Sequence, residues 1–113
     1  MKSKTTQQGG VTVIAVQGSL MGGPDATELN KKIHELIEAG KNLVVLDLAG
    51  VEFINSSGLG MLINSASALK EAGGRLRIAN ASAKIMTIIK ITKLAPILGA
   101  HDSVQDAIAE LKK

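Results

Sequence analysis

The segment from Leu43 to Leu48, which has the sequence Leu-Val-Val-Leu-Asp-Leu, constrains the fold of this chain more than any other. It is nearly all apolar and lacks the alternation of apolar and polar residues that marks a strand facing water on one side. A strand of this kind is buried on both faces, which is typical of the centre of a sheet covered by helices. The segment therefore predicts an α/β fold.

Four further segments are expected to join this central strand. Val11 to Val16 is apolar and β-branched, and Thr5 to Gln8 can pair with it as an edge hairpin across Gly9-Gly10. Arg75 to Ala79 alternates apolar residues with arginines, as a half-exposed strand does. Ile97-Leu98 is expected to add a last short strand.

Apolar residues at helical spacing predict about four helices between these strands. Each apolar stripe is bounded by residues that favour helix ends. The expected boundaries are Pro24 and Gly40 for the first helix, Asn55 and Gly73 for the second, Ser82 and Pro96 for the third, and Ser103, spaced as a capping box with Asp106, for the fourth. The order predicts a mixed sheet of four to five strands in one domain over residues 1–113.

Composition excludes several function classes. The 113 residues include no cysteine, which rules out disulfides, thiolate metal ligands and a cysteine nucleophile. The net charge of +3 is spread over scattered lysines and arginines, and Phe53 is the only aromatic residue, so a nucleic-acid interface is not expected. No apolar run is long enough to span a membrane, and the first residues lack the apolar core of a secretory signal. We therefore expect a cytoplasmic protein without a membrane anchor.

The segment with the most functional information is Val51 to Gly60, where a buried strand leads into Asn55-Ser56-Ser57-Gly58 and then a helix. The free N–H groups and the positive dipole end of a helix N-terminus favour anions. A serine hydroxyl there can cap the helix, or it can carry a phosphate, which adds about two negative charges and three acceptor oxygens. Such a phosphate can change the sign of the surface without disrupting the fold.

The sequence Asn-Ser-Ser-Gly-Leu-Gly at residues 55–60 resembles the Asp-Ser-Ser-Gly-Leu-Gly motif of the bacterial STAS domains that act as anti-sigma factor antagonists. The resemblance extends over nearly the whole chain and includes Gly18-Ser19-Leu20, the Leu43 to Leu48 strand and Gly73-Gly74. It implies the STAS fold. Two positions depart from the family pattern: Asn55 stands where Asp is usual, and Met21 where many members have an Asp.

The resemblance implies a role in a bacterial partner-switching pathway. In this family the first serine of the pair is phosphorylated by an anti-sigma factor that is also a serine kinase, which makes Ser56 the expected phosphoacceptor and Ser57 the second choice. The unphosphorylated protein binds that partner and releases its sigma factor. Residues expected at the docking surface lie in the loop after the second strand, in the serine turn and along the following helix: Met21, Gly22, Asp25, Asn55, Ser56, Ser57, Gly58, Leu59, Met61, Asn64 and Ser65.

We expect no cofactor, no metal and no catalytic residue, and a monomer or weak homodimer. A serine hydrolase would need His34 or His101 as the base, and both are expected to be solvated surface residues. Asp47 is expected to accept hydrogen bonds near the serine turn, and Gly58 and Gly60 to allow close packing of helix and strand. Two alternatives stay open: a STAS scaffold or sensor-complex protein that is not phosphorylated, and a STAS domain that binds a nucleotide or lipid.

Overall fold

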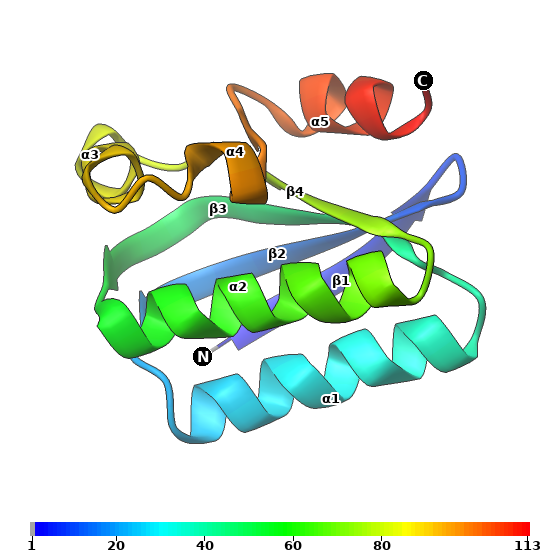
Figure 1. The fold of residues 1–113 in the computed structure, drawn as a ribbon, viewed down its shortest axis with the longest axis horizontal. Coiled ribbons are helices and arrows are strands. Elements are labelled where there is room, and N and C mark those ends of the chain that lie inside the picture. Colours follow the sequence, from blue (N-terminus) through cyan, green and yellow to red (C-terminus); the bar gives the residue numbers. More distant parts are fainter. Residues whose placement is uncertain (1) are drawn as a thin grey trace.

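The computed structural model describes residues 2–113 and contains a five-stranded mixed sheet (Figure 1). The strands are β1 (Lys2–Gln8), β2 (Val11–Leu20), β3 (Leu43–Ile54), β4 (Arg75–Ala79) and β5 (Ala100–His101). They lie side by side in the order β1-β2-β3-β4-β5, with β1 antiparallel to β2 and every other pair parallel. The α/β fold with a mixed sheet is thus confirmed.

Five helices accompany the sheet in the described part of the chain: α1 (Pro24–Glu38), α2 (Ser56–Glu71), α3 (Ala83–Ile91), α4 (Ala95–Leu98) and α5 (Val104–Leu111). Figure 1 shows α1 and α2 side by side below the sheet, α5 above it, and α3 near the end of the sheet at which α2 begins. The short helix α4 packs against α2 and β4.

The central strands are buried on both faces, as the apolar run of β3 predicted. Neighbouring residues of one strand belong to different parts of the core, because successive side chains point to opposite faces. Ile14 and Leu46 pack with residues of α1 and α2, whereas Val13 and Val45 pack with residues of α5. The core is entirely aliphatic apart from Met61.

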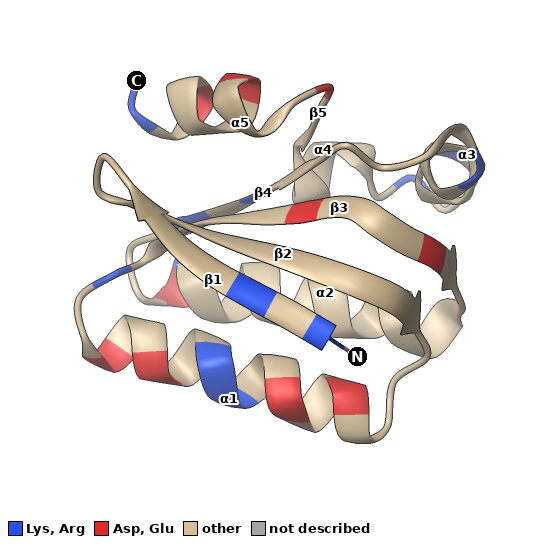
Figure 2. Cartoon of the chain, turned by 180° about the vertical axis from the view of Figure 1, so that it is seen from behind, with Lys and Arg blue, Asp and Glu red and all other residues tan. Residues whose placement is uncertain are grey.

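The outer strand β1 is polar along its whole length and almost fully exposed. Among the described strands it pairs with β2 alone, so it forms one edge of the sheet. Lys2 and Lys4 lie on this strand, which carries blue segments in Figure 2. Charged edge residues of this kind hinder pairing with a strand of another molecule.

The expected strand at Ile97-Leu98 is wrong, because these residues belong to α4. Pro96 lies in the first turn of this helix, where its fixed φ and missing N–H are tolerated. Gly99 then ends the helix in the left-handed region with φ 55°, and the last strand follows at Ala100–His101. His101 therefore lies in the last strand, and the described residues form five helices where about four were expected.

The predicted helix caps at Ser82 and Ser103 are confirmed. The Ile85 N–H donates to Ser82 Oγ at 3.2 Å, and the Asp106 N–H donates to Ser103 Oγ at 3.1 Å. Both hydroxyls satisfy N–H groups that a helix leaves without an internal partner in its first turn.

Candidate docking site

The turn between β3 and α2 is capped by Asn55. Its Oδ1 accepts a hydrogen bond from the Gly58 N–H at 2.8 Å, and its backbone is extended with φ −106°. Ser56 and Ser57 are therefore the first two residues inside the helix and do not cap it. An asparagine at this position serves as well as the aspartate of the family motif, because both side chains accept the same bond.

The two serines present free hydroxyls to solvent. Both residues are exposed, and across residues 2–113 neither hydroxyl takes part in a hydrogen bond. The first turn of α2 also contains no acidic residue. The N-terminal end of the helix thus carries its partial positive charge without a neutralising carboxylate from its own first turn, which favours an added anionic group.

The loop after β2 is held against this turn by hydrogen bonds from Asn55. Its backbone N–H donates to Leu20 O at 3.3 Å, and its Nδ2 donates to Met21 O at 3.4 Å. Asp25 follows at the start of α1, where its N–H donates to Gly22 O at 3.3 Å. The two segments that are expected to share one docking surface are therefore adjacent in the fold.

Gly22 and Gly58 allow this close approach. Gly22 has φ +82°, and a Cβ added to it would lie 2.6 Å from Ser57 Cβ. A Cβ added to Gly58 would collide with Leu20 O and lie 2.8 Å from Ile54 Cγ1. The expected role of Gly58 in packing is confirmed, whereas a Cβ on Gly60 would meet nothing within 4 Å, so Gly60 does not serve that purpose.

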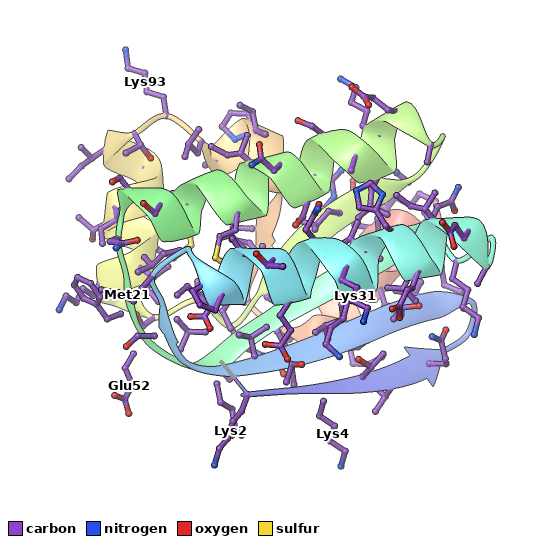
Figure 3. All side chains as sticks on the ribbon, turned by 90° about the horizontal axis from the view of Figure 1, so that it is seen from below. Lys2, Lys4, Met21, Lys31, Glu52 and Lys93 are labelled. Carbon is purple, nitrogen blue, oxygen red and sulfur yellow. The ribbon has the colours of Figure 1, made fainter. Side chains whose placement is uncertain are left out.

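Two large apolar side chains are exposed near the same turn. Met21 is 47% exposed and Phe53 is 40% exposed. Figure 3 shows Met21 and Glu52 pointing outward at this end of the molecule. Lys84 Nζ lies 5.4 Å from the centroid of the Phe53 ring, within the range of a cation–π interaction.

Phe53 was not among the expected docking residues. The periodicity of the strand gives no signal for it, because Glu52 and Phe53 are both exposed between the buried residues Val51 and Ile54. Met21, Phe53 and Lys84 together form a partly apolar, basic rim beside the serines, and we call these three residues the rim.

Met61 and Ser65 are buried, which corrects the expectation that they are exposed to a partner. They are only 4% and 3% exposed because α1 packs beside α2, and Ser65 Oγ donates to Met61 O at 2.9 Å. Asn64, between them, is exposed and lines a shallow groove of about 370 Å³ between the two helices. Gly22, Gly58 and Leu59 are also buried.

The residues considered for other chemistry lie apart from the serines or have structural partners. His34 is exposed on α1, and His101 is half-buried in β5. Asp47 Oδ1 accepts hydrogen bonds from the Ala49 N–H and Asn80 Nδ2, both at 3.1 Å, which confirms its expected role as an acceptor. Within residues 2–113, no group of three or more histidine or acidic side chains is placed to hold a metal ion, and no helix is long and apolar enough to cross a membrane.

The substitution Asn55→Ala is expected to lower the free energy of unfolding by about 1 kcal/mol, because it removes the cap and leaves the Gly58 N–H without a partner. Urea unfolding followed by circular dichroism measures the change. Asn64→Ala, on an exposed position of the same helix, is the matched control and should alter stability by no more than about 0.5 kcal/mol. Equal losses in the two variants would contradict the capping role.

Known proteins share this fold and sequence pattern. A family model described as the STAS domain matches residues 2–107. The anti-sigma-B factor antagonist of Bacillus subtilis (strain 168) is 32% identical over 73 residues, covering 65% of this chain and 66% of the relative.

Two solved structures show the same fold. An anti-sigma factor antagonist from Mycobacterium paratuberculosis superposes with a TM-score of 0.83 at 22% identity, covering 99% of this chain and 94% of the other. The Bacillus cell fate determinant SpoIIAA in its phosphorylated form superposes with a TM-score of 0.74 at 18% identity, covering 99% of this chain and 100% of the other.

Proposed function

The chain belongs to the STAS domain family, and from this membership we propose that it is an anti-sigma factor antagonist controlled by phosphorylation of Ser56. In its unphosphorylated form it binds an anti-sigma factor in the cytoplasm, and the sigma factor held by that partner is released. It acts by binding and has no catalytic activity of its own. The names of its curated relatives support this role, since they too are called anti-sigma factor antagonists.

The observation that carries the proposal is the free hydroxyl of Ser56 at the N-terminus of α2. The group is exposed, has no hydrogen-bond partner within residues 2–113, and lies where the helix dipole favours a negative charge. A kinase partner transfers the terminal phosphoryl group of ATP to Oγ, with loss of the hydroxyl proton and release of ADP. The phosphate then accepts hydrogen bonds from the free N–H groups of the first turn without unfolding the helix.

Ser56 is favoured over Ser57 as the phosphoacceptor because a neighbouring loop packs against Ser57. Gly22 packs so closely against Ser57 that an added Cβ would lie 2.6 Å from Ser57 Cβ. A kinase must surround the hydroxyl that it modifies, and the loop at Gly22 restricts access to Ser57. Ser56 is also the first serine of the pair in the family motif.

Phosphorylation changes the charge of the surface that the partner contacts. The rim of Met21, Phe53 and Lys84 offers apolar area and one positive charge beside the serines. A phosphate placed there brings about two negative charges, which must lose their hydration if a partner covers them. Reversing an equilibrium from mostly bound to mostly free needs about 3 to 5 kcal/mol, and a covered phosphate is sufficient to supply it.

A second function is favoured by Asn55. This residue leaves the first turn of α2 without the carboxylate that the family motif places before the serines, so a kinase that depends on that charge would not recognise the turn. The chain would then be a STAS scaffold that binds its partners without being modified. Both functions use the same docking surface and differ only in phosphorylation.

Mass spectrometry of the tagged protein recovered from its native host distinguishes the two functions. We expect a phosphate localised to Ser56, absent from a Ser56→Ala variant and retained in a Ser57→Ala variant, together with a co-purifying anti-sigma factor that has a kinase domain. A protein that stays unmodified through growth and stress, bound to other STAS proteins, would contradict the switch and support the scaffold.

A further inference from the structure

Charge is unevenly distributed along this chain. No acidic residue occurs between Glu71 and Asp102, and the segment between them contains five of the 13 lysines and arginines. The rest of the chain holds all 10 acidic residues and has a net negative charge, so the positive charge of the protein comes from this segment. In Figure 2, α3 carries blue and no red.

Helix α3 turns a basic and partly apolar surface outward. Ile85 and Ile89 are buried in the core, whereas Lys84, Lys90 and Ile91, on the other side of the helix, are exposed. Figure 1 shows α3 at one end of the molecule. Its outer side can therefore meet a large surface without interference from the rest of the fold.

Two large apolar side chains are exposed where α3 ends and α4 follows. Residues 2–113 contain four exposed large hydrophobic residues, and two of them are Ile91, which is 74% exposed, and Ile97, which is 52% exposed. Pro96, next to Ile97, is also exposed. We call residues 90–97 the α3–α4 tip. Apolar side chains that gather in this way among cations, and are not scattered singly, indicate an interaction surface.

Lys93 has an unfavourable backbone conformation at the α3–α4 tip. Helix α3 ends in a Schellman motif, in which the Leu94 N–H donates to Ile89 O at 3.0 Å and the Lys93 N–H donates to Lys90 O at 3.1 Å. Lys93 therefore has φ 60°, in the left-handed region where glycine is usual because a Cβ is costly there. A lysine at this position adds a positive charge at the expense of stability.

We propose that the α3–α4 tip binds the surface of an anionic lipid bilayer. This inference goes beyond the proposed docking function and does not involve Ser56. The cytoplasmic leaflet has a negative surface potential that attracts lysines close to it. Isoleucine side chains can enter the boundary between the head groups and the acyl chains, while the lysine stems keep their ammonium groups at the level of the head groups.

Two features favour a bilayer over an acidic protein as the partner. The cations of α3 and the tip are all lysines, which are point charges without a fixed hydrogen-bonding geometry, whereas interfaces between proteins are enriched in arginine and depleted in lysine. The tip also protrudes, since the side chain of Lys93 points away from the body of the molecule (Figure 3). A fluid bilayer adapts to protruding side chains, whereas a folded partner would need pockets that match them.

Co-sedimentation of the full chain with lipid vesicles at low salt tests this proposal. We expect at least about tenfold stronger binding to vesicles of phosphatidylglycerol and phosphatidylcholine in equal amounts than to vesicles of phosphatidylcholine alone, and release as salt is added. The variant Lys90→Gln/Lys93→Gln should bind the anionic vesicles at least about tenfold more weakly. The variant Ile91→Gln/Ile97→Gln keeps every charge and should also lose at least about tenfold, because its side chains no longer enter the bilayer.

Two further variants separate binding from folding. Lys31→Gln/Lys41→Gln removes the same charge from exposed positions outside the tip and should bind within about twofold of the wild type. Lys93→Gly should raise the melting temperature by about 3 °C and yet weaken binding about fivefold, which a purely structural role for Lys93 does not allow.

Equal binding to neutral and anionic vesicles would overturn the proposal, and so would an equal loss in the Lys31→Gln/Lys41→Gln control. Unchanged binding of Ile91→Gln/Ile97→Gln would also overturn it, because the vesicles would then attract only the net charge of the protein. Failure to bind anionic vesicles at low salt would leave an acidic protein as the partner of the tip. None of these results depends on whether Ser56 is phosphorylated.

Discussion

The substitution Gly58→Ala is expected to lower the free energy of unfolding by about 3 kcal/mol, enough to reduce the melting temperature by about 10 °C or more. A Cβ at this position collides with the backbone carbonyl of Leu20 and lies 2.8 Å from Ile54 Cγ1. A carbonyl within a strand cannot turn aside as a flexible side chain can. The end of β2 and the first turn of α2 must therefore move apart.

The same helix provides the matched control for this prediction. A Cβ added to Gly60 meets nothing within 4 Å, and Gly60 has ordinary helical backbone angles. Gly60→Ala should therefore raise the free energy of unfolding by about 0.5 to 1 kcal/mol, because alanine restricts the unfolded chain and favours the helix. Urea and thermal unfolding of both variants measure the difference. A similar loss in both would show that the close approach at Gly58 is not what stabilises the turn.

The second large effect is expected on partner affinity. Ser56→Asp should weaken binding of the anti-sigma factor by at least about tenfold relative to Ser56→Ala, since a carboxylate mimics part of the charge of a phosphate. Ser56→Ala should bind constitutively, whether or not the partner's kinase is active. Calorimetric titration with the partner recovered by co-purification measures both affinities.

The control for this experiment is Ser67→Asp. It adds the same charge to an exposed position of the same helix, about 17 Å from the serine turn, and should leave partner affinity within about twofold of the wild type. If Ser56→Asp and Ser56→Ala bind equally well, charge at Ser56 does not control docking. If all three variants bind weakly, docking depends on α2 as a whole and not on the serine turn.

Much of this fold could be predicted because local patterns and tertiary structure agree. The apolar run of β3 requires burial on both faces, and its neighbours Val45 and Leu46 do pack in opposite directions. Ser82 and Ser103 cap helices because their hydroxyls are the nearest acceptors for unpaired N–H groups. The family resemblance predicted that the loop after β2 and the turn between β3 and α2 lie close together.

The parts that could not be predicted depend on contacts between distant segments. β5 has only two residues, too few to show any periodicity, and it exists because β4 offers a free edge beside it. Met61 and Ser65 look like an exposed flank when α2 is considered alone, and they are buried because α1 lies alongside it. Phe53 was overlooked because β3 continues past Leu48 to Ile54.

The order of strands in the sheet is the same as their order in the sequence. Each new strand therefore pairs with the one synthesised before it, and the paired residues of β2 with β3 and of β3 with β4 are only roughly 30 residues apart. On the ribosome the sheet can grow at a single edge, without waiting for a strand from the far end of the chain. Helix α5 follows all five strands in the sequence and covers the apolar face formed by Val13, Val45 and Ala79, so nascent chains from which α5 has not yet emerged expose that face.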